Sequence, residues 1–265
     1  MNPKAERYTG YESVPTIPAG TAEVTVRSHD CEAIPGVAFT IDRTFTPATA
    51  GHDHTNPPSL DRIGSLGSYS GTTDENGEWK TTFTAGDLAS VLTFKASTAS
   101  LLGSPFTSVP FDVGVGFLGL FDPGIEYGDF DVRYTGATGD HGSNHHGTPE
   151  LHHMVREMAL MYNIEADDAV KGSIGLNDMS LELGGVFDIA GAWERPHSRH
   201  RFGTDCDIDR FVRRADGTFV FLNQKLLKFI VEGELSGIFL PESGNRMHVQ
   251  VPEFQVEDIV LRGTR

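Results

Sequence analysis

Apolar and polar residues alternate in four short runs of the N-terminal third of the chain, at residues 22–27, 37–41, 79–83 and 91–96. Alternation with a period of about two residues is typical of strands that bury one face. Turn-forming pairs, Pro35-Gly36 and Asn76-Gly77, separate these runs. After an N-terminal tail over residues 1–20, residues 21–99 are therefore predicted to form an antiparallel β-sandwich.

The hydrophobic period changes to that of a helix after Thr148. This threonine is a favourable N-cap residue, Pro149 suits the first helical position, and Glu150 suits the positive end of the helix dipole. The apolar positions that follow at helical spacing are Leu151, Met154, Val155, Met158 and Tyr162. Such a stripe predicts a helix packed on a core, with His152 and His153 at the surface or the edge of that core.

A second helix is predicted at residues 223–231, and strands and turns elsewhere after residue 163. Residues 148–265 are therefore expected to form a compact α+β domain. The connection over residues 100–147 is rich in Gly, Pro and aromatic residues and too apolar for a free linker. We expect it to pack at the junction between the two domains.

Acidic residues alternate with apolar ones at Asp205, Asp207 and Asp209, which predicts a strand with its carboxylates on one face. Carboxylates so close together repel each other unless a positive group lies beside them, and a divalent metal supplies that charge. His200 precedes this strand and is a candidate to share the metal. Gly203, between them, has no side chain and would let the chain pass close to a metal or substrate.

A second alternating run at residues 247–251 places His248 on the polar face of another predicted strand. Two histidines and one carboxylate, here His200, His248 and Asp207, leave the fourth position of a tetrahedral zinc ion open, as catalytic zinc sites require. The pattern predicts a zinc hydrolase.

Composition narrows the possible partners. The chain has 265 residues, of which 38% are hydrophobic and 22% charged, as expected for a folded protein. Its formal net charge of −16 argues against nucleic acids and anionic membranes as partners. No apolar run is long enough to span a bilayer, and the first residues lack the apolar core of a secretory signal. The two cysteines, Cys31 and Cys206, are expected to be free thiols.

Two further groups of histidines lie outside the predicted metal strands. His52 and His54 belong to a Gly/Ser-rich insertion that reads most simply as a solvated loop, with metal or ligand binding at the domain junction as the alternative. His141, His145 and His146 read as part of a polar loop before the helix, with a role in lining a cleft as the alternative.

The metal strand also resembles a known signature. The residues that carry this resemblance are Ser198-x-His200-x-x-Gly203-x-Asp205-x-Asp207, preceded by Asn177-Asp-Met-Ser180-Leu-Glu-Leu-Gly184-Gly185 and followed by Met247-His248-Val249. They resemble motifs of the superfamily of D-Ala-D-Ala peptidases, murein endopeptidases and hedgehog-type domains, with penicillin-insensitive murein endopeptidases most similar. The resemblance covers about residues 148–251. Separately, residues 73–83 resemble the later hairpin of bacterial immunoglobulin-like modules.

The resemblance implies one zinc ion held by His200, Asp207 and His248. It implies hydrolysis of an amide bond in peptidoglycan stem peptides or their cross-links by a zinc-activated water, in the cell envelope or outside the cell. Asp205 would support a metal ligand or recognise a substrate amine. Ser180 and Ser198 would contact the substrate.

The chain departs from the superfamily at the general base. The position that often carries this base is Arg246, which stays protonated and therefore cannot accept a proton. Glu242 is the best local substitute, with Glu194 and His197 as others. His197 is equally suited to bind substrate or to cap a turn, and Arg246 to stabilise an oxyanion or bind a substrate carboxylate.

Three functional alternatives stay open at the level of the sequence. The domain is a zinc peptidase, or a hydrolase of another peptide or amide substrate. Alternatively, it is a zinc-stabilised binding module that has lost catalysis, as Arg246 favours. A purely structural, β-rich adhesin-like protein is the third possibility.

Overall fold

The structure of the protein is a computed structural model. It describes residues 19–25, 32–46, 51–56, 58, 62–84, 88, 90–101, 104–108, 110–115, 120, 122, 132–136, 139–188, 191–193, 200–241 and 246–251. The chain divides into two compact units. We call the unit of residues 13–49, 57–116 and 258–265 the strand unit. The unit of residues 1–12, 50–56 and 117–257 is the mixed unit.

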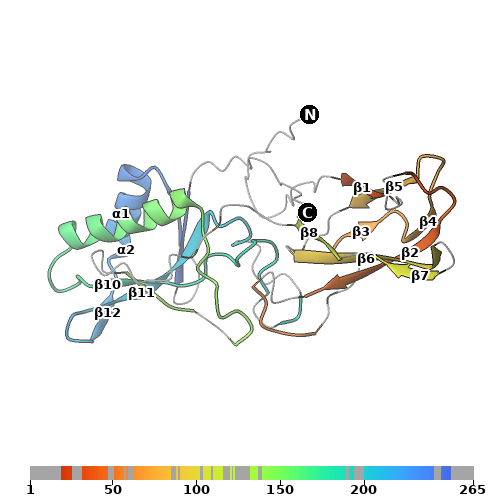
Figure 1. The fold of residues 1–265 in the computed structure, drawn as a ribbon. Coiled ribbons are helices and arrows are strands. Elements are labelled where there is room, and N and C mark those ends of the chain that lie inside the picture. Colours follow the sequence, from red (N-terminus) through yellow and green to blue (C-terminus); the bar gives the residue numbers. More distant parts are fainter. Residues whose placement is uncertain are drawn as a thin grey trace. The chain divides into compact units, whose positions relative to one another are not determined.

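The strand unit contains two antiparallel sheets (Figure 1). The smaller sheet has the order β1–β5–β3, formed by Ala19–Thr25, Glu78–Thr84 and Ser65–Leu66. The larger sheet has the order β4–β2–β6–β7, with β8 also paired to β6; its strands are Ser70–Thr72, Ala38–Phe45, Ser90–Leu101, Ser104–Thr107 and Phe111–Val115. The two sheets contact each other through aromatic rings packed edge to face, Phe39 on Trp79 and Phe83 on Phe94.

The described residues of all four alternating runs lie in strands of this unit, except Val37, which directly precedes β2. The larger sheet continues beyond residue 99 into β7 and β8. The expectation of a hairpin around residues 73–83 is wrong. Strand β4 pairs with β2, whereas β5 pairs with β1 and β3. The turn closed by the Gly77 amide and the Asp74 carbonyl therefore carries the chain from one sheet to the other.

The described residues of the mixed unit form one sheet and two α-helices. The strand order is β13–β14–β11–β10–β9, with β12 also paired to β11, and only the β10–β9 pair is parallel. These strands are Ile238–Pro241, Arg246–Gln250, Asp205–Arg213, Ser173–Leu176, Val132–Tyr134 and Phe219–Phe221. Helix α1 spans Pro149–Glu165 and α2 spans Gln224–Phe229. The predicted α+β class is thus confirmed.

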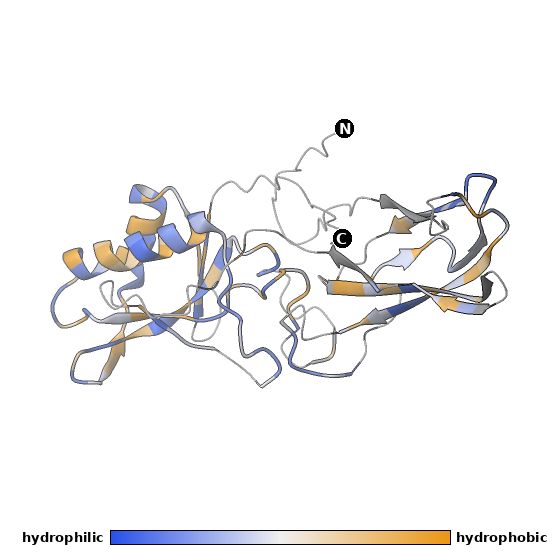
Figure 2. Ribbon diagram, viewed as in Figure 1, coloured by the Kyte–Doolittle hydropathy of each residue, from blue (hydrophilic) through white to orange (hydrophobic). Residues whose placement is uncertain are grey.

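Helix α1 begins as the sequence predicts. The Thr148 side chain accepts a hydrogen bond from the backbone N–H of Leu151, and Pro149 occupies the first turn. All five residues of the predicted stripe are buried, and Figure 2 shows hydrophobic and hydrophilic residues alternating along the helix. His152 is buried at 3% exposure whereas His153 is exposed, so the pair straddles the edge of the core.

The second predicted helix is also present. Asn223 caps α2, and the helix continues as a π-helical turn over Ile230–Glu234, three residues further than expected. Neither helix in the described part of the chain is long and apolar enough to cross a membrane.

The central strand β11 has one face on the hydrophobic core of the mixed unit and polar residues on its other face. Cys206 and Ile208 on β11 and Val249 on β14 belong to the same hydrophobic cluster as the buried face of α1. Each fully buried aliphatic side chain of this kind contributes about 1.5–3 kcal/mol to folding. Alternation then places the neighbouring Asp207 and His248 on the opposite face of the sheet. Cys206 is a buried free thiol, as predicted, whereas Cys31 lies outside the described residues.

Candidate metal centre

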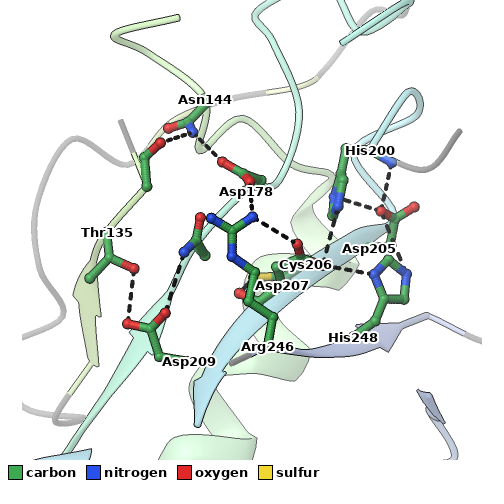
Figure 3. Close-up of polar contacts among 12 residues, drawn as sticks. Thr135, Asn144, Asp178, His200, Asp205, Cys206, Asp207, Asp209, Arg246 and His248 are labelled. Atoms are coloured by element: carbon green, nitrogen blue, oxygen red, sulfur yellow. Dashed lines mark hydrogen bonds and ion pairs between the residues drawn. The ribbon is translucent and has the colours of Figure 1, made fainter. Parts of the chain in front are cut away.

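The pairing of β11 with β14 places Asp207 directly opposite His248. Residues opposite each other in an antiparallel pair project to the same face, so these two side chains meet. The Nδ1 atom of His248 lies 3.0 Å from Oδ1 of Asp207. The Nε2 atom of His200, which precedes β11, lies 3.3 Å from the same oxygen. Figure 3 shows both rings facing this carboxylate.

These three side chains could hold a metal ion. Each offers one ligand atom, all of these atoms lie within 4.8 Å of one another, and all three residues are buried. Ligands at about 2.0–2.2 Å from a tetrahedral ion lie about 3.3–3.6 Å apart, close to the two separations seen here. The structure therefore brings together the three residues that the sequence selected.

Asp205 contacts His200 at the backbone and at the ring nitrogen that does not face Asp207. One oxygen, Oδ1, lies 2.8 Å from both the backbone nitrogen and the Nδ1 atom of His200. His200 has a left-handed backbone with φ of 64°, a conformation that costs a residue with a side chain about 1–2 kcal/mol. The double contact offsets this cost and directs Nε2 of the ring toward Asp207. A carboxylate on the second nitrogen of a histidine is the usual support of a metal ligand.

The protonation of this group reflects its excess of carboxylates. Burial lowers the pKa of His200, but Asp205 and Asp207 outweigh burial and raise it to about 10. Burial raises the pKa of Asp207, but His200 and His248 outweigh it and hold this pKa well below its usual range. Without a metal, a proton on His200 therefore partly balances two carboxylates, and a divalent cation would displace that proton.

Arg246 lies on the far side of Asp207. Its Nη1 atom donates a hydrogen bond to Oδ2 of Asp178 at 2.9 Å and lies 3.7 Å from Oδ2 of Asp207. The amide of Asn144 donates to the other oxygen of Asp178 at 2.7 Å. Burial raises the pKa of Asp178, and Arg246 partly opposes this shift. Arg246 thus bridges a supporting carboxylate and the metal-facing one.

Sequence reasoning missed Asp178 and Asn144 as parts of this arrangement. Asp178 lies inside the motif quoted upstream of the metal strand, so the resemblance contained a signal for it. Asn144 belongs to the histidine-containing loop, and nothing in its local sequence indicates a contact with Asp178.

Asp209 does not join the group, although it alternates with Asp205 and Asp207. Its carboxylate accepts hydrogen bonds from Arg133 at 3.0 Å and from Thr135 at 3.2 Å. The expectation that three carboxylates share one positive group is therefore wrong: a guanidinium balances Asp209, and the metal group has only two acids beside its histidines.

Close packing against the start of α1 requires a glycine at position 203. It has a φ of +66°, and a Cβ atom there would lie 2.5 Å from the Leu120 side chain and 3.0 Å from the Gly147 backbone. The Gly203 carbonyl accepts a hydrogen bond from the Thr148 amide. The absent side chain thus lets the chain pass the start of α1, and the expected close approach to a metal or substrate stays a prediction.

The remaining predicted site residues are placed as follows. Ser180 is buried, and its backbone carbonyl accepts a hydrogen bond from the His146 amide. Glu242, His197, Ser198 and Glu194 lie outside the described residues. The roles predicted for these residues stay predictions.

The histidines outside the metal strands differ from expectation. His52 is 1% exposed, so the solvated-loop interpretation is wrong for this residue. His141 lies in a loop before α1, as predicted, but its side chain is buried at 0% exposure. Burial lowers the pKa of His52. His145 stacks on Tyr134 and its Nε2 atom lies 2.8 Å from the Thr135 carbonyl, which is a structural role.

Neither a protein-family model, a curated protein nor a solved structure matches this chain.

Proposed function

We propose that the mixed unit is a zinc-dependent peptidase that hydrolyses an amide bond in peptidoglycan stem peptides or their cross-links. One observation carries the proposal: three buried ligand atoms of His200, Asp207 and His248 within 4.8 Å of one another. The described residues supply three ligands to this group, which leaves a tetrahedral ion one position for water or substrate. Catalytic zinc sites have this composition, whereas structural ones have four protein ligands.

The donor set suits zinc. Neutral imidazole nitrogens and a carboxylate oxygen are common zinc ligands, and both nitrogens face the same carboxylate oxygen. When bound, zinc would polarise the scissile carbonyl and lower the pKa of a coordinated water toward about 7.

The surrounding residues would fix and tune this centre. Asp205 orients His200 and favours the tautomer with a proton on Nδ1, so that the lone pair of Nε2 would bind the cation. Asp178 holds the guanidinium of Arg246, which lies 3.7 Å from the second oxygen of Asp207. The Arg246 side chain is 39% exposed, so its guanidinium can also meet an anionic group of the substrate. Glu242 remains our predicted general base.

The substrate follows from the resemblance alone. The motifs around His200 and His248 resemble those of murein endopeptidases, which indicates peptidoglycan, and fold likeness by itself does not select a substrate. A zinc hydrolase of another peptide or amide would use the same three ligands. In this proposal the strand unit is an immunoglobulin-like accessory domain that positions the enzyme on a cell-wall or protein partner.

A catalytically inactive, zinc-stabilised binding module is the second candidate. The observation that favours it is Arg246, which occupies the usual position of the base and is paired with Asp178 at 2.9 Å. A residue that is protonated at all relevant pH values cannot accept a proton from water.

Digestion of purified peptidoglycan by the zinc-loaded protein separates these candidates, with products resolved by chromatography and identified by mass spectrometry. The peptidase proposal expects new peptide termini with the parent protein and none with His248→Ala. The matched control is Asp209→Asn, on the same face of β11 but bonded to Arg133, and it should cleave like the parent. Zinc-dependent sedimentation with peptidoglycan but no cleavage would support the binding module. Cleavage of unrelated peptides alone would reassign the substrate.

A further inference from the structure

Four buried side chains converge in the mixed unit apart from the group around Asp207. They are His52, His54, His141 and Asp188, and each offers one ligand atom within 4.8 Å of the others. They come from three segments far apart in the sequence, residues 51–56, 139–147 and 186–193. The exposed fractions of the side chains are 1%, 7%, 0% and 1%, respectively.

Five of the six distances between the four ligand atoms are nearly equal, and the sixth is at most 4.8 Å. Nδ1 of His52 lies 3.1 Å from Nε2 of His54 and 3.2 Å from Nε2 of His141. Oδ1 of Asp188 lies 3.3 Å from the ligand atoms of His52 and His54 and 3.2 Å from that of His141. The centre of a regular tetrahedron with such edges lies about 1.9–2.0 Å from each corner, close to zinc–nitrogen and zinc–oxygen bond lengths.

Protons alone satisfy this arrangement poorly. A neutral imidazole carries one N–H, and the other ring nitrogen is only an acceptor. Five distances between the three ring nitrogens and the carboxylate oxygen are 3.1–3.3 Å. Hydrogen bonds at all five distances would need several protons in one small buried space. A single cation at the centre accepts all four lone pairs at once.

Neighbouring groups orient these ligands. The Nδ1 atom of His54 lies 2.7 Å from Oδ1 of Asn56, which as an acceptor fixes the ring proton on Nδ1 and directs the Nε2 lone pair to the group. The second oxygen of Asp188 accepts a hydrogen bond from the backbone N–H of Trp193. The Trp193 ring packs on both His52 and His54, at centroid distances of 4.4 and 4.3 Å. Partners of this kind are typical of metal ligands.

We propose that His52, His54, His141 and Asp188 form a second, structural zinc site in this protein. Four protein ligands close the coordination sphere, which is the composition of a structural site and contrasts with the three ligands around Asp207. The ion ties residues 51–56 to the loops that carry His141 and Asp188. The backbone N–H of Asp53 donates a hydrogen bond to the Asp140 carbonyl at 2.8 Å. This hydrogen bond joins two of the segments that the ion would connect. The inference does not depend on peptidase activity.

Zinc content per chain tests the site, measured by mass spectrometry after zinc loading and gel filtration. The parent should retain two zinc ions, one for each group of ligands. His54→Gln, at the least buried of the four ligands, should retain one, and so should a His200→Ala, His248→Ala double variant. The exposed His153→Ala is the matched control and should retain both. A parent with a single zinc that survives His54→Gln would overturn the proposal.

X-ray absorption at the zinc edge provides a second readout that leaves all four ligands unchanged. In the His200→Ala, His248→Ala protein, the remaining zinc should show a four-coordinate shell with three imidazoles. In the parent protein, zinc removal should accelerate hydrogen exchange of the Asp53 amide. A shell dominated by water oxygens, or an exchange rate that zinc does not change, would contradict the site.

Discussion

Asp205→Asn tests whether a carboxylate behind His200 supports a metal ligand. In the parent, Oδ1 of Asp205 lies 2.8 Å from both the backbone nitrogen and the Nδ1 atom of His200. Asparagine has nearly the same shape, and its carbonyl oxygen can still accept from these donors. The substitution therefore removes mainly the negative charge that strengthens the ring as a ligand.

The expected effect is a loss of zinc affinity without loss of fold. Removing a partner of this kind typically weakens metal binding about 10–100-fold. This range corresponds to about 1.4–2.7 kcal/mol of binding free energy. We expect the upper part of the range, because Asp205 is 4% exposed and contacts both the ring and the backbone of His200.

Competition against a chromophoric zinc chelator would measure this difference, with circular dichroism to confirm that the variant is folded. The measurement would be repeated in the His54→Gln background, where the first group alone should bind zinc. The matched control is Asp209→Asn, two residues beyond Asp207 on the same strand, which should bind zinc like the parent. If Asp205→Asn and the control both bind zinc within about twofold of the parent, Asp205 does not support a metal ligand.

Three further outcomes follow from the same geometry. Arg246→Gln should lower the free energy of unfolding by about 1–3 kcal/mol in denaturant titrations, because it leaves the buried Asp178 carboxylate without its strongest donor; an unchanged midpoint would contradict this. Gly203→Ala should destabilise the mixed unit by about 1–3 kcal/mol or more, since it combines a φ of +66° with a 2.5 Å contact to Leu120, and equal thermal stability would refute the packing argument. Zinc affinity at the first group should rise about tenfold per pH unit between about pH 7 and 9, because the metal displaces one proton from His200, whose pKa is raised to about 10. A flat profile above pH 7 would show that His200 is already neutral.

The metal-free protein should show the opposite dependence on pH. A histidine whose pKa is raised in the folded state stabilises the fold fully below its unfolded pKa of 6.5, and this contribution is lost as pH rises toward about 10. Asp207 has a lowered pKa, so its contribution is present above pH 3.8 and is lost at lower pH. The two dependences place the largest contribution of this pair between about pH 4 and 6.5.

Alternation along the chain predicts two of the three residues of the first metal group, Asp207 and His248, whereas His200 precedes β11 and lies in no alternating run. A strand with period two separates Cys206 and Ile208 from Asp205 and Asp207, and a second alternating strand carries His248. The sequence does not give the register between β11 and β14. Because each strand has one polar face and one buried face, a shift by one residue would put the wrong side chains in the core, and this restricts the register strongly. The start of α1 was predicted equally well, because its capping signal at Thr148 is local.

The second metal group could not be predicted from such patterns. Its ligands lie in loops, where no hydrophobic period fixes the direction of a side chain, and His52 and Asp188 are separated by more than half of the chain. Asp209 shows the opposite failure: the alternation places it correctly on the polar face, but its partner Arg133 comes from a distant strand. Long-range partners of this kind depend on the topology of the sheet.

Anomalous diffraction at the zinc absorption edge, from crystals of the zinc-loaded protein, tests the central claim most directly. We predict a peak about 2.0–2.2 Å from Nε2 of His200, Nδ1 of His248 and Oδ1 of Asp207. A zinc-loaded crystal with no anomalous peak between these three atoms would contradict the account.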